Sequence, residues 1–165
     1  MINLKELGVL PSADGTDFYR RLSEINGFYE ERGKLTMESI VGFCIDRAKD
    51  AYILGMSEVC SFLCGKSIEE MLSIQFEGKN PTKKIPDLCD LIGWAKDTSI
   101  LDDQNAKIAH EVREKRNDYG HAFLKILKGR LDKEPNRRPF SDKEALDTYE
   151  KAVKVLKYSY EHVTS

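Results

Sequence analysis

The chain has 165 residues and a formal net charge of −2, with 41% hydrophobic and 33% charged residues. This length suits one domain that buries about 70% of the surface of its unfolded chain, and the composition excludes a disordered protein. No apolar run approaches the ~20 residues of a membrane span, and the first residues lack the layout of a signal peptide. We therefore expect a folded protein without a membrane partner.

The net charge argues against a protein that coats nucleic acid nonspecifically, so any contact with nucleic acid is expected to be local. Residues 113–138 fit this expectation, because they hold nine Lys or Arg against four Asp or Glu. The four cysteines form no disulfide framework, which favours a reducing cytoplasm. Cys60 and Cys64 stand four apart on an expected helix, but no nearby His or second Cys pair completes a metal site. We expect both thiols to be buried, with no metal and no cofactor.

Helical periodicity predicts three helices in the first half of the chain, over about residues 16–32, 36–54 and 57–76. Gly33 is expected to end the first helix. Gly55 is expected to form a tight joint between the second and third helices, as in an antiparallel hairpin. Val, Ile and Thr never cluster with period-two alternation, so we expect no strand.

The second half predicts three more helices. Pro86 suits the first turn of a short helix. A long helix is expected from Asp102 or Asp103 to about Leu127, with acids that complement the dipole at its start. Residues 141–144, Ser-Asp-Lys-Glu, form a capping box before the last helix. The sequence predicts an all-α antiparallel bundle of about six helices, with residues 1–35 as an N-terminal helical extension and residues 36–165 as the bundle.

The long helix carries Arg116-Asn-Asp-Tyr-Gly-His121. On a helical wheel, Arg116 falls within an apolar stripe formed by Ile108, Ala109, Val112, Tyr119, Phe123, Ile126 and Leu127. A guanidinium directed toward apolar surface needs a partner or a groove, because an unpaired buried charge is very costly. As an alternative to a functional site, Arg116 pairs with a Glu or Asp inside the bundle and His121 is an ordinary surface residue. His110, Arg113, Asn117 and His121 lie beside the stripe, with Asn117 and His121 one turn apart. Gly120 lowers helix propensity by about 1 kcal/mol relative to Ala, but permits close approach of a backbone or a phosphate.

Three segments in this order resemble a HEPN domain, an all-helical family found in prokaryotic toxins and defence nucleases. The first is the hairpin from Cys44 through Gly55 into Lys66-Ser-Ile-Glu-Glu-Met-Leu72, and the second is Leu88-Cys-Asp-Leu-Ile-Gly-Trp-Ala95 followed by Ile100-Leu101. The third is Arg113-Glu-Lys-Arg-Asn-Asp-Tyr-Gly-His121, similar to the family signature of Arg, four to six residues, then His, with a polar residue after the Arg. The resemblance covers about residues 36–162.

The resemblance implies a HEPN-like bundle whose motif helix packs at a homodimer interface and forms a metal-independent endoribonuclease site there. Arg116 and His121 are then the catalytic candidates, with Asn117 as a supporting polar residue. It also implies a toxin or defence ribonuclease with RNA as substrate and an antitoxin protein as a further partner. Some toxin members carry a Tyr two residues after the His that a nucleotidyltransferase modifies; this position is Phe123 here.

Cleavage of RNA by its own 2′-hydroxyl needs a base, an acid and positive charge at the phosphate. His110 is about 16 Å from His121 along the helix axis, too far to share one phosphate. A two-fold dimer would supply a second His121 and a second Arg116 to one cleft. The residues expected to steer RNA toward it are Arg113, Lys125, Lys128 and Arg130; as an alternative, they form only a solvated basic face. Two other functions remain open, a non-catalytic helical adaptor for a protein partner and a nucleotide-binding protein.

Overall fold

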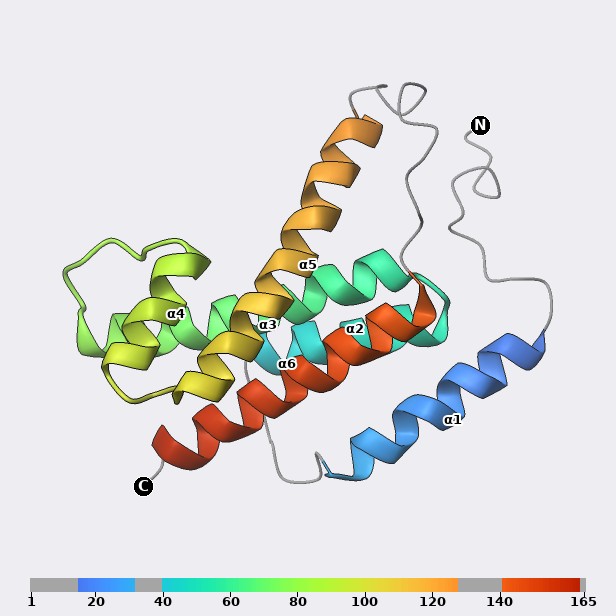
Figure 1. Ribbon diagram of the computed structural model, residues 1–165, viewed down its shortest axis with the longest axis horizontal. Coiled ribbons are helices and arrows are strands. Elements are labelled where there is room, and N and C mark those ends of the chain that lie inside the picture. Colours follow the sequence, from blue (N-terminus) through green and yellow to red (C-terminus); the bar gives the residue numbers. More distant parts are fainter. Residues whose placement is uncertain (1–14, 32–39, 128–140, 164–165) are drawn as a thin grey trace.

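The computed structural model describes residues 15–31, 40–127 and 141–163 of the chain. Within them the protein is an all-α bundle of six helices, as the sequence predicts (Figure 1). The helices are α1 (Gly15–Glu31), α2 (Ile40–Ile53), α3 (Ser57–Lys79), α4 (Leu88–Asp97), α5 (Asp103–Leu127) and α6 (Asp142–Val163). No helix in these ranges is long and apolar enough to cross a membrane.

Helix α3 is the centre of the bundle and packs against α2, α4, α5 and α6. The apolar faces of these helices meet in one core, because each helix carries buried apolar residues at spacings of three and four. Its largest fully buried aliphatic side chains are Ile25, Ile45, Ile68, Met71, Leu72, Leu91, Ile92, Leu101 and Leu156. Cys60 and Cys64 are also fully buried, as predicted. No group of three or more His, Cys, Asp or Glu in the described part of the chain could hold a metal ion.

The turn between α2 and α3 depends on Gly55. Its φ is +75°, and the chain closes a Schellman motif there, because Met56 N–H donates to Ala51 O at 2.8 Å and Gly55 N–H donates to Tyr52 O at 2.9 Å. A Cβ at Gly55 would lie 2.7 Å from Nη1 of Arg21. The predicted joint is confirmed, and its positive φ favours a glycine.

Two helix starts test the capping predictions. The capping box before α6 is present: Ser141 N–H donates to Glu144 Oε2 at 3.0 Å, and Glu144 N–H donates to Ser141 Oγ at 3.2 Å. The prediction for Pro86 is wrong by two residues, because α4 begins at Leu88. Asp87 is its N-cap and accepts a hydrogen bond from Asp90 N–H at 3.1 Å. An Asp side chain satisfies a free N–H at the helix start, which Pro cannot do.

Helix α1 is attached to the bundle by a polar cluster as well as by buried Ile25. The Nε of Arg21 donates to Asp142 at 2.8 Å, and Arg20 donates to the same carboxylate at 2.7 Å. Ser57 donates to the second oxygen of Asp142 at 3.0 Å. Burial opposes ionisation of Asp142, but these three donors hold its pKa below the ordinary value. One carboxylate at the start of α6 therefore joins α1, α3 and α6.

Candidate functional site

Arg116 occupies the place where α5 crosses α3. Its Nη2 donates to both carboxylate oxygens of Glu69, at 3.0 and 3.2 Å, and its guanidinium lies 5.8 Å from the centre of the Phe62 ring. About 20% of each side chain of the ion pair is exposed. Ala109 and Val112, on the same stripe of α5, are buried. The sequence predicts that Arg116, on the apolar stripe of α5, needs a partner. That partner is the carboxylate of Glu69 on α3.

Gly65 permits this arrangement. A Cβ on Gly65 would lie 2.6 Å from Cδ and 2.7 Å from Cβ of Arg116, distances at which atoms overlap. The aliphatic stem of Arg116 therefore lies directly against the backbone of α3, and the guanidinium reaches Glu69 one turn further along. Glu69 is itself held by Lys66, whose Nζ lies 2.9 Å from Oε2. The backbone of α3 at Gly65 and the carboxylate of Glu69 therefore fix the position of the guanidinium.

The anchoring of Arg116 leaves most of its donors unused. An arginine has five N–H donors, and both hydrogen bonds to Glu69 come from Nη2. In the described part of the chain, no hydrogen bond joins Nη1 or Nε to a protein acceptor. The guanidinium is therefore oriented by the protein and still able to bind an anion.

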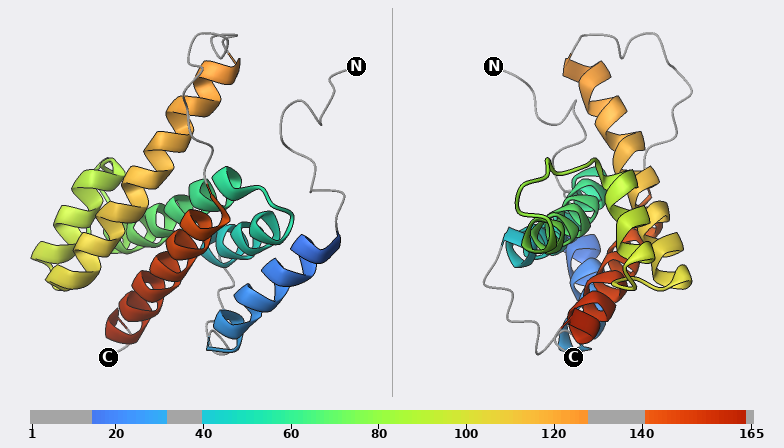
Figure 2. Two further views of the ribbon diagram at one scale, coloured as in Figure 1. Left: turned by 45° about the vertical axis from the view of Figure 1, so that its right-hand side comes forward. Right: turned by 90° about the vertical axis from the view of Figure 1, so that its left-hand side faces the viewer.

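Beyond Arg116, helix α5 leaves the bundle. In Figures 1 and 2 its second half extends past α3 and α6, with no other helix beside it in any of the three views. A Cβ on Gly120 would meet no atom of another element within 4 Å, and Asn117 is exposed. Asn117, the residue directly after Arg116, is thus presented to the surroundings of this chain.

The other predicted site residues are only partly described. The structure gives the backbone of His121 and Lys125 within α5, whereas Lys128 and Arg130 lie outside the described residues. Arg113 is less available than a steering residue should be, because 24% of its side chain is exposed and its Nε is buried with no hydrogen-bond partner. Its Nη2 lies 4.0 Å from Glu114.

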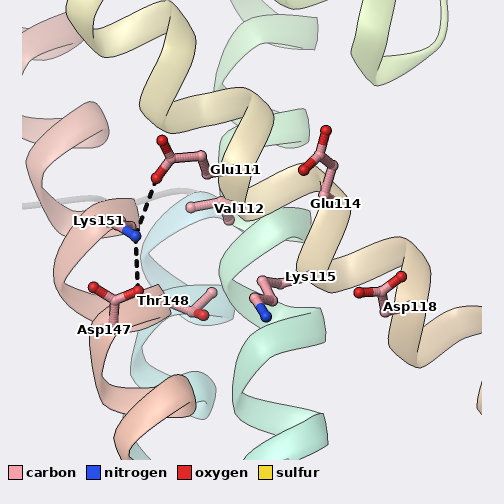
Figure 3. Close-up of a pocket in the computed structure, with 8 residues that line it drawn as sticks. All are labelled: Glu111, Val112, Glu114, Lys115, Asp118, Asp147, Thr148 and Lys151. Atoms are coloured by element: carbon pink, nitrogen blue, oxygen red, sulfur yellow. Dashed lines mark hydrogen bonds and ion pairs between the residues drawn. The ribbon is translucent and has the colours of Figure 1, made fainter.

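The side of α5 that faces α6 is acidic. A cavity of about 210 Å³ lies there, lined by Glu111, Val112, Glu114, Lys115, Asp118, Asp147, Thr148 and Lys151 (Figure 3). Lys151 lies between two carboxylates, 3.0 Å from Glu111 and 2.7 Å from Asp147. Four carboxylates against two ammonium groups make this cavity unfavourable for a phosphate.

Beside this cavity, another face of α5 is turned toward α4. A groove of about 250 Å³ is lined by Ile92, Gly93, Lys96, Asp103, Ala106, Lys107 and His110. Burial, and then the charge of Arg113, lower the pKa of His110 below its ordinary value, which favours the neutral imidazole at neutral pH. On α5, Lys107 and His110 of this groove stand one turn before Glu111 and Glu114 of the acidic cavity, so the groove and the cavity are neighbours along the helix.

Comparison of the chain with protein-family models, with curated proteins and with solved structures gave no match. The residues that sequence reasoning missed are Gly65 and Glu69, the partners of Arg116 on α3. A glycine inside a predicted helix indicates that another part of the protein packs closely against the helix there, and Gly65 is such a glycine. Glu69 stands one turn after it on the same face.

Proposed function

We propose that the protein is a metal-independent endoribonuclease whose site forms when two copies bring their α5 helices together. The observation that carries the proposal is the arrangement of Arg116. Glu69 and Gly65 orient its guanidinium, and within the described residues its Nε and Nη1 donors remain unused. Asn117 and His121 follow it on the part of α5 that leaves the bundle. Arginine in this state can still donate to a phosphate oxygen from Nε or Nη1, while Glu69 holds Nη2.

The second copy supplies what one chain lacks. One His121 removes the proton from a ribose 2′-hydroxyl, and the 2′-oxygen attacks the adjacent phosphorus. The bond from phosphorus to the 5′-oxygen breaks, and the other His121 gives that oxygen a proton. The products are a 2′,3′-cyclic phosphate and a 5′-hydroxyl. The Arg116 side chains stabilise the added negative charge on the phosphoryl oxygens, and Asn117 orients the imidazole or an oxygen.

Three properties of α5 support a dimer of this kind. Its second half has no other described helix beside it, its apolar stripe continues in sequence through Tyr119 and Phe123, and Gly120 leaves room for a close neighbour. Apolar surface carried on an unaccompanied helix is typical of an interface.

Purified protein tests the chemistry directly. Single-stranded RNA should be cut in the presence of EDTA and leave cyclic-phosphate or 3′-phosphate ends, whereas DNA of the same sequence should be spared because it lacks the 2′-hydroxyl. His121→Ala should abolish cleavage, and Asn117→Ala should lower it only in part. Cleavage that persists in His121→Ala would reject the mechanism.

Mixing tests whether two copies share one site. When wild type is refolded with an equal amount of His121→Ala, random pairing leaves about a quarter of the dimers with two histidines. Activity per wild-type chain should then fall to about half. Unchanged activity per wild-type chain, or a single 18.9 kDa species in light scattering at micromolar concentration, would argue against a composite site.

A specific observation favours a second function, that of a helical adaptor for a protein partner. Phe43 and Ile40 lie on α2 with more than half of their surface exposed, and the guanidinium of Arg47 lies 5.2 Å from the centre of the Phe43 ring. Exposed aromatic and Arg side chains are enriched at protein interfaces. A partner bound by wild type and by His121→Ala, but not by Phe43→Ser, would favour the adaptor.

A further inference from the structure

The groove between α4 and α5 has the composition of a site for one nucleotide. Ile92, Gly93 and Ala106 give it an apolar lining, and Lys96, Asp103, Lys107 and His110 give it a polar one. The single acid, Asp103, is engaged by Lys96 at 2.9 Å. In the usual sites for single-stranded nucleic acid, bases stack on aromatic rings and positive charge contacts the backbone; this groove offers aliphatic side chains and the His110 ring in their place.

Lys107 carries the unpaired positive charge of this groove. In the described part of the chain it has no ion pair and no hydrogen bond, whereas Lys96 is paired with Asp103. His110, one turn along α5, is half-buried and favours its neutral form, in which the ring both donates and accepts a hydrogen bond. A neutral ring of this kind suits the edge or face of a base, and a free ammonium suits a phosphate.

The size of the groove limits the occupant. Its volume of about 250 Å³ lies just below the roughly 300 Å³ at which pockets for small molecules begin. A Cβ on Gly93 would meet nothing within 4 Å, so the absence of a side chain there widens the groove. The volume therefore limits the occupant to a small group, of which a single base is one.

The groove lies on the same side of α5 as the proposed cleavage site. At about 100° per residue, His110, Asn117 and His121 fall within one narrow arc of the helix. His110 precedes His121 by eleven residues, about 16 Å along the axis. An RNA strand held at His121 can reach the groove within a few nucleotides.

From this placement we infer that the α4–α5 groove is a subsite that binds one base of single-stranded RNA a few nucleotides away from the cleaved phosphate. The inference rests on the proposed function, since the cleavage site defines the strand that the groove would hold. The inference predicts that Gly93, Lys107 and His110 determine which length of RNA the protein binds best.

Filling the groove is the direct test. Gly93→Leu places a side chain in open space, and Leu has a higher helix propensity than Gly, so the fold is kept. Gly78→Leu is the matched control, because a Cβ there also meets nothing within 4 Å and Gly78 does not line the groove. The probe is a fluorescent 2′-O-methyl oligonucleotide, which has no free 2′-hydroxyl and is not cleaved.

Gly93→Leu should weaken binding of a hexanucleotide about tenfold, as expected for the loss of one base contact, and leave binding of a dinucleotide unchanged. Gly78→Leu should bind both as wild type does. Lys107→Glu should also weaken hexanucleotide binding and reduce its salt dependence, whereas Lys154→Glu on α6 should do so much less.

Two results would overturn the subsite: hexanucleotide binding by Gly93→Leu equal to that of wild type, or no binding of the hexanucleotide by wild type. The subsite and the proposed function can fail separately. RNA cleavage with equal binding by Gly93→Leu and wild type rejects the subsite and keeps the enzyme. Binding that depends on Gly93 without cleavage keeps the subsite and rejects the enzyme.

Discussion

Gly65→Ala is the smallest change that separates Arg116 from α3. The added Cβ would lie 2.6 Å from Cδ and 2.7 Å from Cβ of Arg116. The Arg116 Cβ is fixed to the backbone of α5, so rotation of the side chain cannot relieve both overlaps. Either the two helices move apart or Arg116 adopts another rotamer, and in both cases its guanidinium loses its position on Glu69.

The magnitude follows from two opposing effects. Replacement of Gly by Ala inside a helix stabilises it by about 1 kcal/mol. Overpacking of a close contact costs typically about 1–3 kcal/mol. The net change should lie between neutral and about 2 kcal/mol of destabilisation. In Gly93→Ala, also inside a helix, the Cβ meets nothing within 4 Å, so only the stabilising effect should remain.

Urea unfolding of wild type, Gly65→Ala and Gly93→Ala measures these free energies of unfolding. The two variants should differ by about 1–3 kcal/mol, with Gly93→Ala the more stable. RNA cleavage by Gly65→Ala should fall at least about tenfold while the variant remains folded. Equal stabilisation by both substitutions would refute the close contact, and full activity in Gly65→Ala would refute a role for the position of Arg116.

Three further predictions follow from the described contacts. Glu69→Gln should lower the free energy of unfolding by roughly 1 kcal/mol and weaken RNA binding, because Arg116 loses a charged partner, whereas Glu77→Gln at an exposed position of α3 should leave binding unchanged. Because the folded pKa of Asp142 is depressed, its contribution to stability is complete above the ordinary carboxyl pKa of about 3.9 and is lost as the pH falls through the lower folded pKa. The stability advantage of wild type over Asp142→Asn, measured by thermal unfolding, should therefore shrink below about pH 4; an advantage that is the same at every pH would contradict it. An aromatic disulfide reagent should modify Cys89 quickly in the native protein, because the other three thiols are buried; fast modification that persists in Cys89→Ser would show that the thiols on α2 or α3 are accessible.

The helices could be predicted because the information is local. The apolar spacing along α6 gives the buried residues Ala145, Tyr149, Ala152 and Leu156, and the capping box gives its start. The start of α4 was harder, since Pro86 and Asp87 both favour a helix beginning and only the hydrogen bond to Asp90 N–H decides between them. Local patterns therefore predict the existence of a helix better than its first residue.

The contacts of the candidate site could not be predicted from local sequence patterns. The helical wheel requires a partner for Arg116, but it cannot say that the partner is Glu69, 47 residues earlier in the chain. That pairing depends on how α3 and α5 cross, which is set by the whole core. The groove between α4 and α5 was missed for the same reason, because Gly93 and His110 line one groove only when α4 folds back against α5.

The two glycines near Arg116 differ in what this chain asks of them. Gly65 is explained within the chain, because the stem of Arg116 occupies the place of a side chain. Gly120, inside α5, has open space around it, so no contact with another described element requires a glycine there, although it weakens the helix by about 1 kcal/mol relative to Ala. A partner outside the chain that approaches α5 closely beside His121 would account for it. A second α5 helix and the phosphate held between the two copies are such partners, and both belong to the proposed site.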